Sequence, residues 1–286
     1  MKYEASQNLS REEFKRLFGV KRETFAQMIE IMQQAAKSKR KGKGGVKAKL
    51  SLEDQILVTL QYWREYRPYF HIANDWEVSE STICRTVKKV ENVLIKSEKF
   101  RLAGKKVIVA QEQPPALIAI DVTEVKVERP IHHQKHFYSG KKKLHAIKAQ
   151  LVLNLTDLKI ICTAYGNGKQ HDFSLFKASG VRFHEQTQGL ADKGYQGLQN
   201  LHPNSLIPIK KPKNGSLSKE DKQFNRQLAR QRIAIEHVNR RLKIFKILSL
   251  PYRNRRRRFG LRCNLIAAIY NFEVALPTSK TSSPQS

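Results

Sequence analysis

The apolar pattern of this chain changes near residue 100. Before it, apolar side chains recur at helical spacing, as in Phe25, Met28 and Met32. After it they form short unbroken runs, of which residues 116–120 are the first, as expected for a strand covered on both faces. We therefore expect an all-α region over residues 1–100, followed by an α/β domain over residues 101–276. The 286 residues are enough for sizeable cores in both.

The first helices are marked by their ends. Ser10 and Glu13 form a capping-box pattern that opens a helix, and Gly19 closes it. Residues 37–49 then hold seven basic side chains and no acidic one, with three glycines among them. Such a run is typical of a solvated loop, but its position before a DNA-reading unit favours a basic linker that contacts nucleic acid.

A helix-turn-helix is predicted at about residues 50–95. Ser51 is expected to cap its first helix, Pro68 begins a short second one, and Ser79 is expected to cap the recognition helix. Amphipathic helix pairs are common, so a purely structural helical hairpin is the alternative. The predicted DNA-facing side chains are short hydroxyls and long cations that can reach bases and phosphates. They are Ser81, Thr82, Arg85, Thr86 and Lys89.

The second part alternates strands and helices, which predicts a mixed α/β arrangement around one sheet. Thr156 and Asp157 are turn residues between two antiparallel strands. Residues 277–286 have the Ser/Thr/Pro composition of a disordered tail. The expected elements are strands at 116–120, 144–155, 158–165, 188–191 and 205–209, and helices at 172–179, 218–248 and 265–272.

The charge balance indicates the class of partner. Fifty-four Lys and Arg against 25 Asp and Glu give a net charge of +29, whose self-repulsion a polyanion would relieve. We therefore expect nucleic acid as the partner. No run approaches the length of a membrane span, and the first residues lack the apolar segment of a secretion signal. Cys84, Cys162 and Cys263 are too scattered for a metal site, so reduced cysteines in a cytoplasmic protein are expected.

Three carboxylates are candidates for chemistry. Asp121 and Asp192 each follow an apolar strand, the position where ligands gather in α/β sheets. Asp121 is preferred to Glu124, which alternation places on the other face. Glu236 lies on the long helix, where Arg232, Arg240 and Lys243 are near it at helical spacing. Taken singly, each could be a turn former or a salt-bridged surface residue.

Together, these residues fit phosphoryl transfer on DNA. That reaction uses hard oxygen ligands to hold two Mg²⁺ ions about 3.5–4 Å apart, one activating the attacking oxygen and one stabilising the leaving oxygen. Cations on the same helical face would neutralise the scissile and neighbouring phosphates.

The sequence resembles the DDE-superfamily transposases of bacterial insertion sequences, in particular the insertion sequence family five group and its Harbinger-like relatives. Residues 192–195, Asp-Lys-Gly-Tyr, match the signature of the second aspartate. Arg232, Glu236 and Lys243 match the spacing of the third signature, in which Ala229 replaces the usual tyrosine. Asp121-Val122-Thr123 is similar to the first-aspartate strand, with Val122 where the Harbinger-like branch prefers glycine.

The resemblance implies an RNase H-like catalytic domain behind the helix-turn-helix, and a catalytic triad of Asp121, Asp192 and Glu236. Asp121 would bridge two Mg²⁺ ions, for which Mn²⁺ can substitute, while Asp192 and Glu236 would each hold one. The implied reaction is hydrolysis at the ends of an insertion sequence, followed by attack of the freed 3′-hydroxyl on target DNA. A homodimer or larger synaptic complex on double-stranded DNA in the nucleoid is implied. Asp172, which opens a helix after His171, is explained as an N-cap and is left out of the triad.

Basic residues around the triad are expected to contact DNA. Two alternatives stay open at this point: a DNA-binding regulator that has lost catalysis, and a nuclease that cuts without joining. The run of four arginines after the long helix has no apolar periodicity and no acidic neighbour in sequence, so we expect it to lie along the DNA backbone rather than in an intramolecular network. The predicted contacts in the catalytic domain are Lys193, Arg232, Arg240, Lys243, Arg255, Arg256, Arg257 and Arg258.

Overall fold

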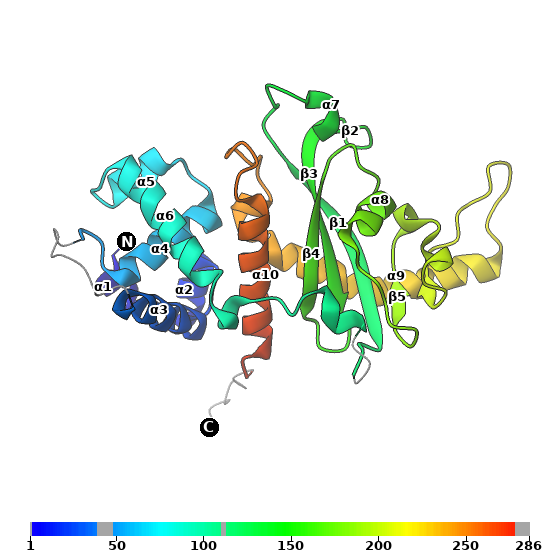
Figure 1. Ribbon diagram of the computed structural model, residues 1–286, viewed down its shortest axis with the longest axis horizontal. Helices are drawn as coiled ribbons and strands as arrows, with labels where there is room; N and C mark the ends of the chain where they lie inside the picture. The colour runs from blue at the N-terminus through cyan, green and yellow to red at the C-terminus, as the bar shows by residue number, and fades with distance from the viewer. Residues whose placement is uncertain (1, 39–47, 110–112, 278–286) are drawn as a thin grey trace, which may run out of the picture.

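The computed structural model describes residues 2–38, 48–109 and 113–277 (Figure 1). Most of the basic run at 37–49 and nearly all of the 277–286 tail lie outside these residues. Within the described part, no helix is both long and apolar enough to cross a bilayer.

The N-terminal region is all helical, and its helices begin at the residues that their capping patterns indicate. Ser10 and Glu13 form the complete capping box. Ser51 and Ser79 each accept a hydrogen bond from the backbone N–H three residues on. The elements are α1 (Tyr3–Ser6), α2 (Arg11–Phe18), α3 (Arg22–Lys37), α4 (Leu52–Glu65), α5 (Tyr69–Asp75), α6 (Glu80–Leu94), η1 (Glu98–Phe100) and η2 (Lys105–Val109).

The second region is built on a mixed sheet with strand order β2-β3-β1-β5-β6, in which β4 also pairs with β3. β1 is antiparallel to β3 and parallel to β5. The turn at Thr156 and Asp157 joins β3 to β4 as predicted. The strands are β1 (Leu117–Lys126), β2 (Tyr138–Ser139), β3 (Leu144–Asn154), β4 (Ile160–Asn167), β5 (Gln188–Leu190) and β6 (Ser205–Leu206).

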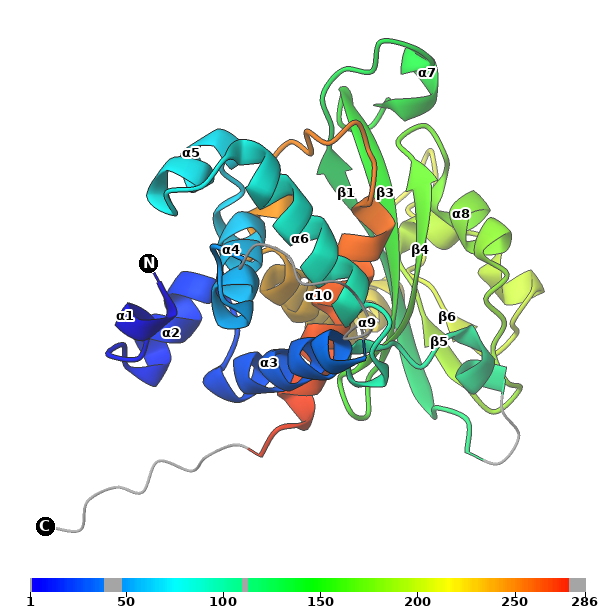
Figure 2. The same cartoon turned by 60° about the vertical axis from the view of Figure 1, so that its left-hand side comes forward.

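Helices cover both faces of the sheet. α9 and α10 lie on one face and α8 on the other, and α10 stands between the sheet and the N-terminal helices (Figures 1 and 2). The mixed α/β fold and the helical N-terminal region are thus as predicted. The remaining elements are α7 (Gln134–Phe137), α8 (Asp172–Ser179), η3 (Lys193–Tyr195), η4 (Leu198–Asn200), α9 (Lys219–Leu242), η5 (Lys246–Leu248) and α10 (Phe259–Ala275).

One hydrophobic cluster joins the two regions. It contains Trp63 and Val87 of the N-terminal helices, Ala119 of β1 and Leu265 of α10, all fully buried. A second cluster, with Ile120 and its neighbours, lies under the other face of the sheet. The all-α region is therefore packed onto the sheet face that carries α9 and α10.

Several predicted boundaries are wrong. α10, expected at 265–272, runs from Phe259 to Ala275, and β6 ends at Leu206 rather than near residue 209. β1 does not stop at Asp121, because its pairing with β3 continues to Lys126. α9 ends at Leu242 rather than near residue 248, because Phe245 and Ile247 leave the helical path and turn into the core.

Candidate active site

Asp121 lies inside β1, opposite Leu151 of β3, and not at the end of the strand. It is two residues from Ala119, whose side chain belongs to the cluster under α9 and α10. Because side chains alternate along a strand, Asp121 also points to the α9 face, and Glu124 points to the other. The predicted choice of Asp121 over Glu124 agrees with this placement.

Asp192 comes level with Asp121 through the parallel pairing of β1 and β5. The last pair in that ladder is Ala119 with Leu190, and the two aspartates each follow two residues later. Asp192 caps η3, and its Oδ1 accepts a hydrogen bond from the N–H of Gly194 at 2.8 Å. The end of β5 and the middle of β1 therefore present two carboxylates to one region.

α9 crosses this region with the face that helical spacing predicts. Asn239 Nδ2 donates to Asp121 Oδ2 at 2.8 Å, and Arg232 Nη2 lies 3.5 Å from Asp121 Oδ1. Glu236 is one turn from each of them and is exposed. Asn239, which was not among the predicted site residues, is thus the closest hydrogen-bond partner of Asp121.

The three carboxylates affect one another electrostatically. Burial raises the pKa of Asp121 to about 6; Arg232 opposes this shift, and the charges of Asp192 and Glu236 add to it. Burial and the charge of Lys142 lower the pKa of Lys243, while Asp121 raises it. Asp192 and Glu236 therefore interact as like charges with the half-buried carboxyl of Asp121, and Arg232 is its cationic neighbour.

The sequence comparisons identify the family of this arrangement. A family model described as DDE superfamily endonuclease matches residues 120–276, more than half of the chain. The chain belongs to this superfamily. A second family model, described as the helix-turn-helix of DDE superfamily endonuclease, matches residues 48–100. A probable transposase for insertion sequence element IS702, from Microchaete diplosiphon, is 54% identical over 276 residues, which cover 96% of this chain and 99% of that protein.

DDE superfamily endonucleases generally use divalent metal ions, and the carboxylates of this site have the matching chemistry. Among the described residues, no group of three or more His, Cys, Asp or Glu side chains is already arranged to hold a metal ion. Asp121, Asp192 and Glu236 nevertheless supply the hard carboxylate oxygens that Mg²⁺ prefers, and their mutual repulsion is what a cation would relieve. The chemistry of these donors fits a divalent ion.

A second polar cluster lies on the opposite face of β1. Lys148 of β3 is 7% exposed, and its Nζ lies 2.7 Å from Asp172 Oδ1 and 3.7 Å from Glu124 Oε1. The explanation of Asp172 as an N-cap is wrong: His171 is the N-cap of α8, and the carboxylate of Asp172 pairs with Lys148 instead. Only the packing of β3 against α8 brings these residues together, so no local pattern in the chain indicates this pair.

The helix-turn-helix has the predicted geometry. Glu77 takes the left-handed conformation, φ 53°, at the turn position where glycine is common. Ser81 and Arg85 are exposed on α6, and Thr82 is half-buried. Lys89 Nζ donates to Gln55 Oε1 at 2.8 Å, so its ammonium is held at the surface of α4. Thr86 was wrongly placed on the outer face: it is buried, because it is next to Val87 and Val90 on the packed side.

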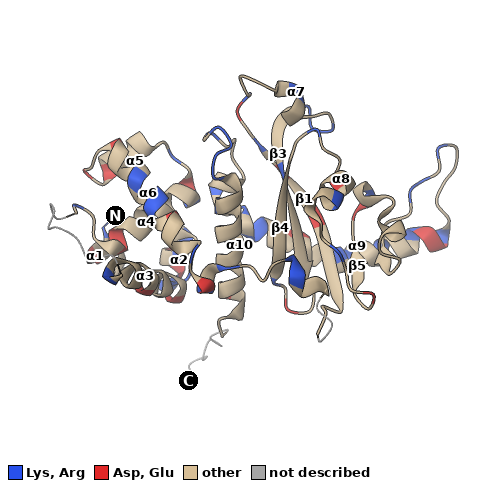
Figure 3. Ribbon diagram, in the orientation of Figure 1, with Lys and Arg blue, Asp and Glu red and all other residues tan. Residues whose placement is uncertain are grey.

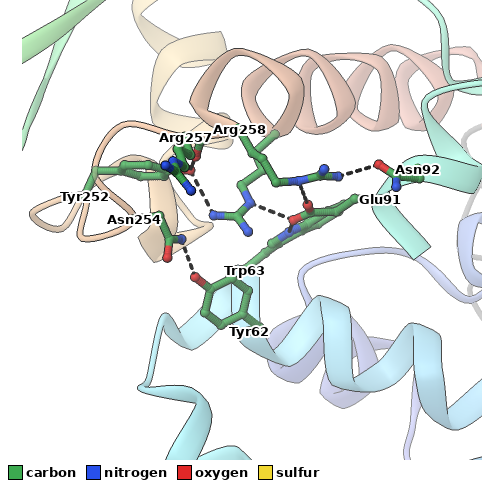
Figure 4. A network of polar contacts seen from close by, with 9 residues as sticks. Tyr62, Trp63, Glu91, Asn92, Tyr252, Asn254, Arg257 and Arg258 are labelled. Atoms are coloured by element: carbon green, nitrogen blue, oxygen red, sulfur yellow. Dashed lines mark hydrogen bonds and ion pairs between the residues drawn. The ribbon is translucent and has the colours of Figure 1, made fainter. Parts of the chain in front are cut away.

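The arginine run is not free of acidic partners, which corrects the expectation for Arg258. Its Nε donates to Glu91 Oε2 at 2.6 Å and its Nη2 donates to Asn92 Oδ1 at 2.7 Å (Figure 4). Arg262 Nε donates to the other oxygen of the same, fully buried Glu91 at 2.6 Å. Glu91 is 167 residues from Arg258 in the chain, so inspection of neighbouring residues could not reveal the pair.

The other predicted cations are distributed over the catalytic region. Arg255 and Arg257 are exposed, and the guanidinium of Arg256 lies 4.2 Å from the centre of the Phe137 ring. Lys193 and Arg240 are exposed as well. Figure 3 shows Lys and Arg positions in blue on the ribbon of α6, along α9 and in the loop that precedes α9.

Proposed function

We propose that the protein is a DNA transposase that binds the ends of an insertion sequence, cleaves them by metal-dependent hydrolysis and joins the freed 3′-hydroxyl to target DNA. The observation that carries this proposal is the pairing of β1 with β5, which brings Asp121 and Asp192 to one level, while Asn239 and Arg232 of α9, on either side of Glu236 in the helix, contact Asp121. The identity of 54% to a probable transposase supports it.

Each residue then has a role. Asp121, Asp192 and Glu236 would hold two divalent metal ions. We propose that these ions are Mg²⁺ and that Mn²⁺ can replace them. When bound, the ions supply an activated attacking oxygen and a stabilised leaving oxygen. Arg232 keeps Asp121 in place and offsets the negative charge around it. Lys193, Arg240 and Lys243 would hold phosphates on either side of the scissile bond.

The same arrangement can serve both steps. A water molecule and a DNA 3′-hydroxyl are both oxygen nucleophiles, so one set of carboxylates suffices for hydrolysis and for strand transfer without a covalent enzyme intermediate. The helix-turn-helix would select the element ends through α6. Two or more copies of the chain would hold both ends in one complex in the nucleoid.

A comparison of Asp192→Ala with Asp157→Ala tests the proposal. Asp157 is an exposed aspartate in the β3–β4 turn, paired with Lys159, and serves as the matched control. We expect Asp192→Ala to lower cleavage of end-containing DNA in Mg²⁺ by more than about a thousandfold, since the triad acts as a unit, and to leave binding nearly unchanged. Asp157→Ala should cut and join as the wild type does.

The rival functions give different results in the same assays. Cleavage by Asp192→Ala at the wild-type rate would overturn the site assignment. A wild-type protein that binds the ends but never cuts them would be a DNA-binding regulator, and one that cuts without joining a labelled end to a target plasmid would be a nuclease.

A further inference from the structure

A cavity of about 970 Å³ opens on the side of Lys148 and Asp172 and reaches Gly194, in the segment that follows Asp192. Its walls are the segment from Gln134 to His145, which includes α7 and β2, and the loop from β4 to α8. Gly194 also lines it, and a Cβ built on this glycine would lie 2.9 Å from Asp172 Oδ2 and 3.0 Å from Asp192 Oδ1. The wall of the cavity at Gly194 therefore lies close to the carboxylates of both Asp172 and Asp192.

The lining of the cavity is strongly cationic. Arg129, Lys135, Lys141 and Lys169 contribute to it, and across the described ranges none of these four forms an ion pair with a carboxylate. Asp172 is the carboxylate in the wall, and Lys148 already neutralises it at 2.7 Å. The cavity therefore attracts an anion, and its cations are spread over both walls rather than gathered at one point.

Aromatic side chains give the cavity a second property. Tyr138 and His145 both line it and contact each other edge to face, with ring centroids 5.6 Å apart at 69°. Tyr138 remains 43% exposed, so His145 supports the ring without covering it. An exposed aromatic face among cations is the combination that binds single-stranded nucleic acid, by stacking the bases and tracking the phosphates.

We propose that this cavity receives an unstacked nucleotide of the DNA strand that passes the carboxylates, with its base on Tyr138 and its neighbouring phosphates at Lys135, Lys141 and Lys169. This rests on the proposed function and adds that the strand is locally unpaired. Inside a duplex both faces of each base are covered by its neighbours, so only a base that has left the stack can lie on Tyr138. The cavity volume falls within the range of pockets that enclose small ligands.

Binding without catalysis tests the proposal. The full chain in chelator is titrated into a fluorescein-labelled single-stranded thymidine oligonucleotide and, separately, into a labelled random duplex, and fluorescence anisotropy is recorded. Tyr138→Ala should weaken binding of the single strand about tenfold, the effect of losing one stacked base, and change duplex binding by less than about twofold. Tyr138→Phe keeps the ring and should bind the single strand as the wild type does.

The cations are tested with a matched pair of lysines. Lys169→Gln should lower the slope of log affinity against log salt for the single strand by about 0.7, the value for one phosphate contact. Lys159→Gln, on the exposed β3–β4 turn, should leave the slope unchanged. Thermal unfolding of each variant verifies that it is folded.

Several results would overturn the inference. It fails if a folded Tyr138→Ala binds the single strand as the wild type does, if it loses as much affinity for duplex, or if Tyr138→Phe loses as much as Tyr138→Ala. These outcomes are independent of the cleavage assay. Asp192→Ala is expected to keep its single-strand affinity, so a failed triad and a failed nucleotide pocket give different patterns.

Discussion

At the scale of single residues, Asp121 is a carboxylate whose position costs folding free energy. Its pKa is raised to about 6, first by burial and then by the charges of Asp192 and Glu236, so the folded state takes up its proton more readily than the unfolded chain. Below about pH 3 the carboxyl is largely protonated in both states and little is lost. Between about pH 4 and 6 the unfolded chain has lost this proton while the folded protein still holds it, so the free energy of unfolding decreases over this range and levels off above it.

We therefore expect Asp121→Asn to stabilise the metal-free protein above about pH 7, by on the order of 1–3 kcal/mol, and to have almost no effect near pH 3. The amide oxygen can still accept the hydrogen bond from Asn239, so the geometry is kept. Urea unfolding in chelator at both pH values measures the difference. An Asp121→Asn variant less stable than the wild type at the higher pH would contradict the argument.

The place of a residue in the fold could be predicted where its local pattern determines it. Asp192 follows a short strand and Glu236 has a helical period, and such signals do not depend on distant parts of the chain. The expectations for Asp172 and Arg258 are wrong for the opposite reason. Their partners, Lys148 and Glu91, come from other elements, and only tertiary packing brings each pair together.

At the scale of elements, α6 has one face that packs in the fold and one that we propose to contact DNA. Arg85 is exposed on its outer face, and across the described residues no ion pair holds it to a carboxylate. We expect Arg85→Ala to weaken binding to the element end by about 1–3 kcal/mol more than binding to random duplex, because a base contact discriminates by that amount. Gel-shift titrations on both DNAs measure this. Lys96→Ala, just beyond the C-terminal end of the helix, is the control, and an equal loss on both DNAs would make Arg85 a phosphate contact.

The inner face of α6 is tied to α10 by a buried network. Glu91 accepts hydrogen bonds from Arg258, Arg262 and Trp63, and Arg262 is 2% exposed. Arg262→Met should cost about 3–5 kcal/mol of unfolding free energy, because it leaves a buried carboxylate short of its partner. Arg255→Met, at an exposed site in the arginine run before α10, should leave the unfolding free energy almost unchanged.

A double-mutant cycle separates this ion pair from packing. Glu91→Leu combined with Arg262→Met removes both charges, so the double variant should lose clearly less than the sum of the two single losses. Denaturant unfolding of the four proteins gives the coupling energy. Strictly additive losses would mean that the network contributes through packing alone.

The order of the elements could be predicted better than their lengths. The change from helical spacing to unbroken apolar runs predicted the two regions and the order of strands and helices. The continuation of β1 past Asp121 depends on its pairing with β3, and the early end of α9 depends on where Phe245 is buried. Neither has a signal within the segment itself, so the predicted boundaries are wrong although the elements are present.

At the scale of the whole molecule, the net charge of +29 leaves a large surplus of cations for DNA. Arg255 and Arg257 are the exposed members of the arginine run, and replacing both with glutamine should weaken binding to every DNA sequence. The salt dependence should become shallower by about 0.9 for each phosphate that is no longer neutralised, or about 2 in total. The affinity for random duplex, measured over a series of salt concentrations, tests this. Arg258 is left intact because its loss would disturb Glu91, and an unchanged slope would contradict the prediction.

The two faces of α6 have a consequence for how such an element can evolve. Glu91 and Thr86 are buried and cannot change without damage to the fold, whereas Ser81 and Arg85 are exposed. Mutations at the exposed positions can therefore accumulate with little effect on stability or on the catalytic region. With the proposed selection of element ends by α6, a copy of the element whose terminal sequences drift would acquire a matching protein through a few substitutions on one helix. Lineages can thereby diverge until neither enzyme mobilises the DNA of the other.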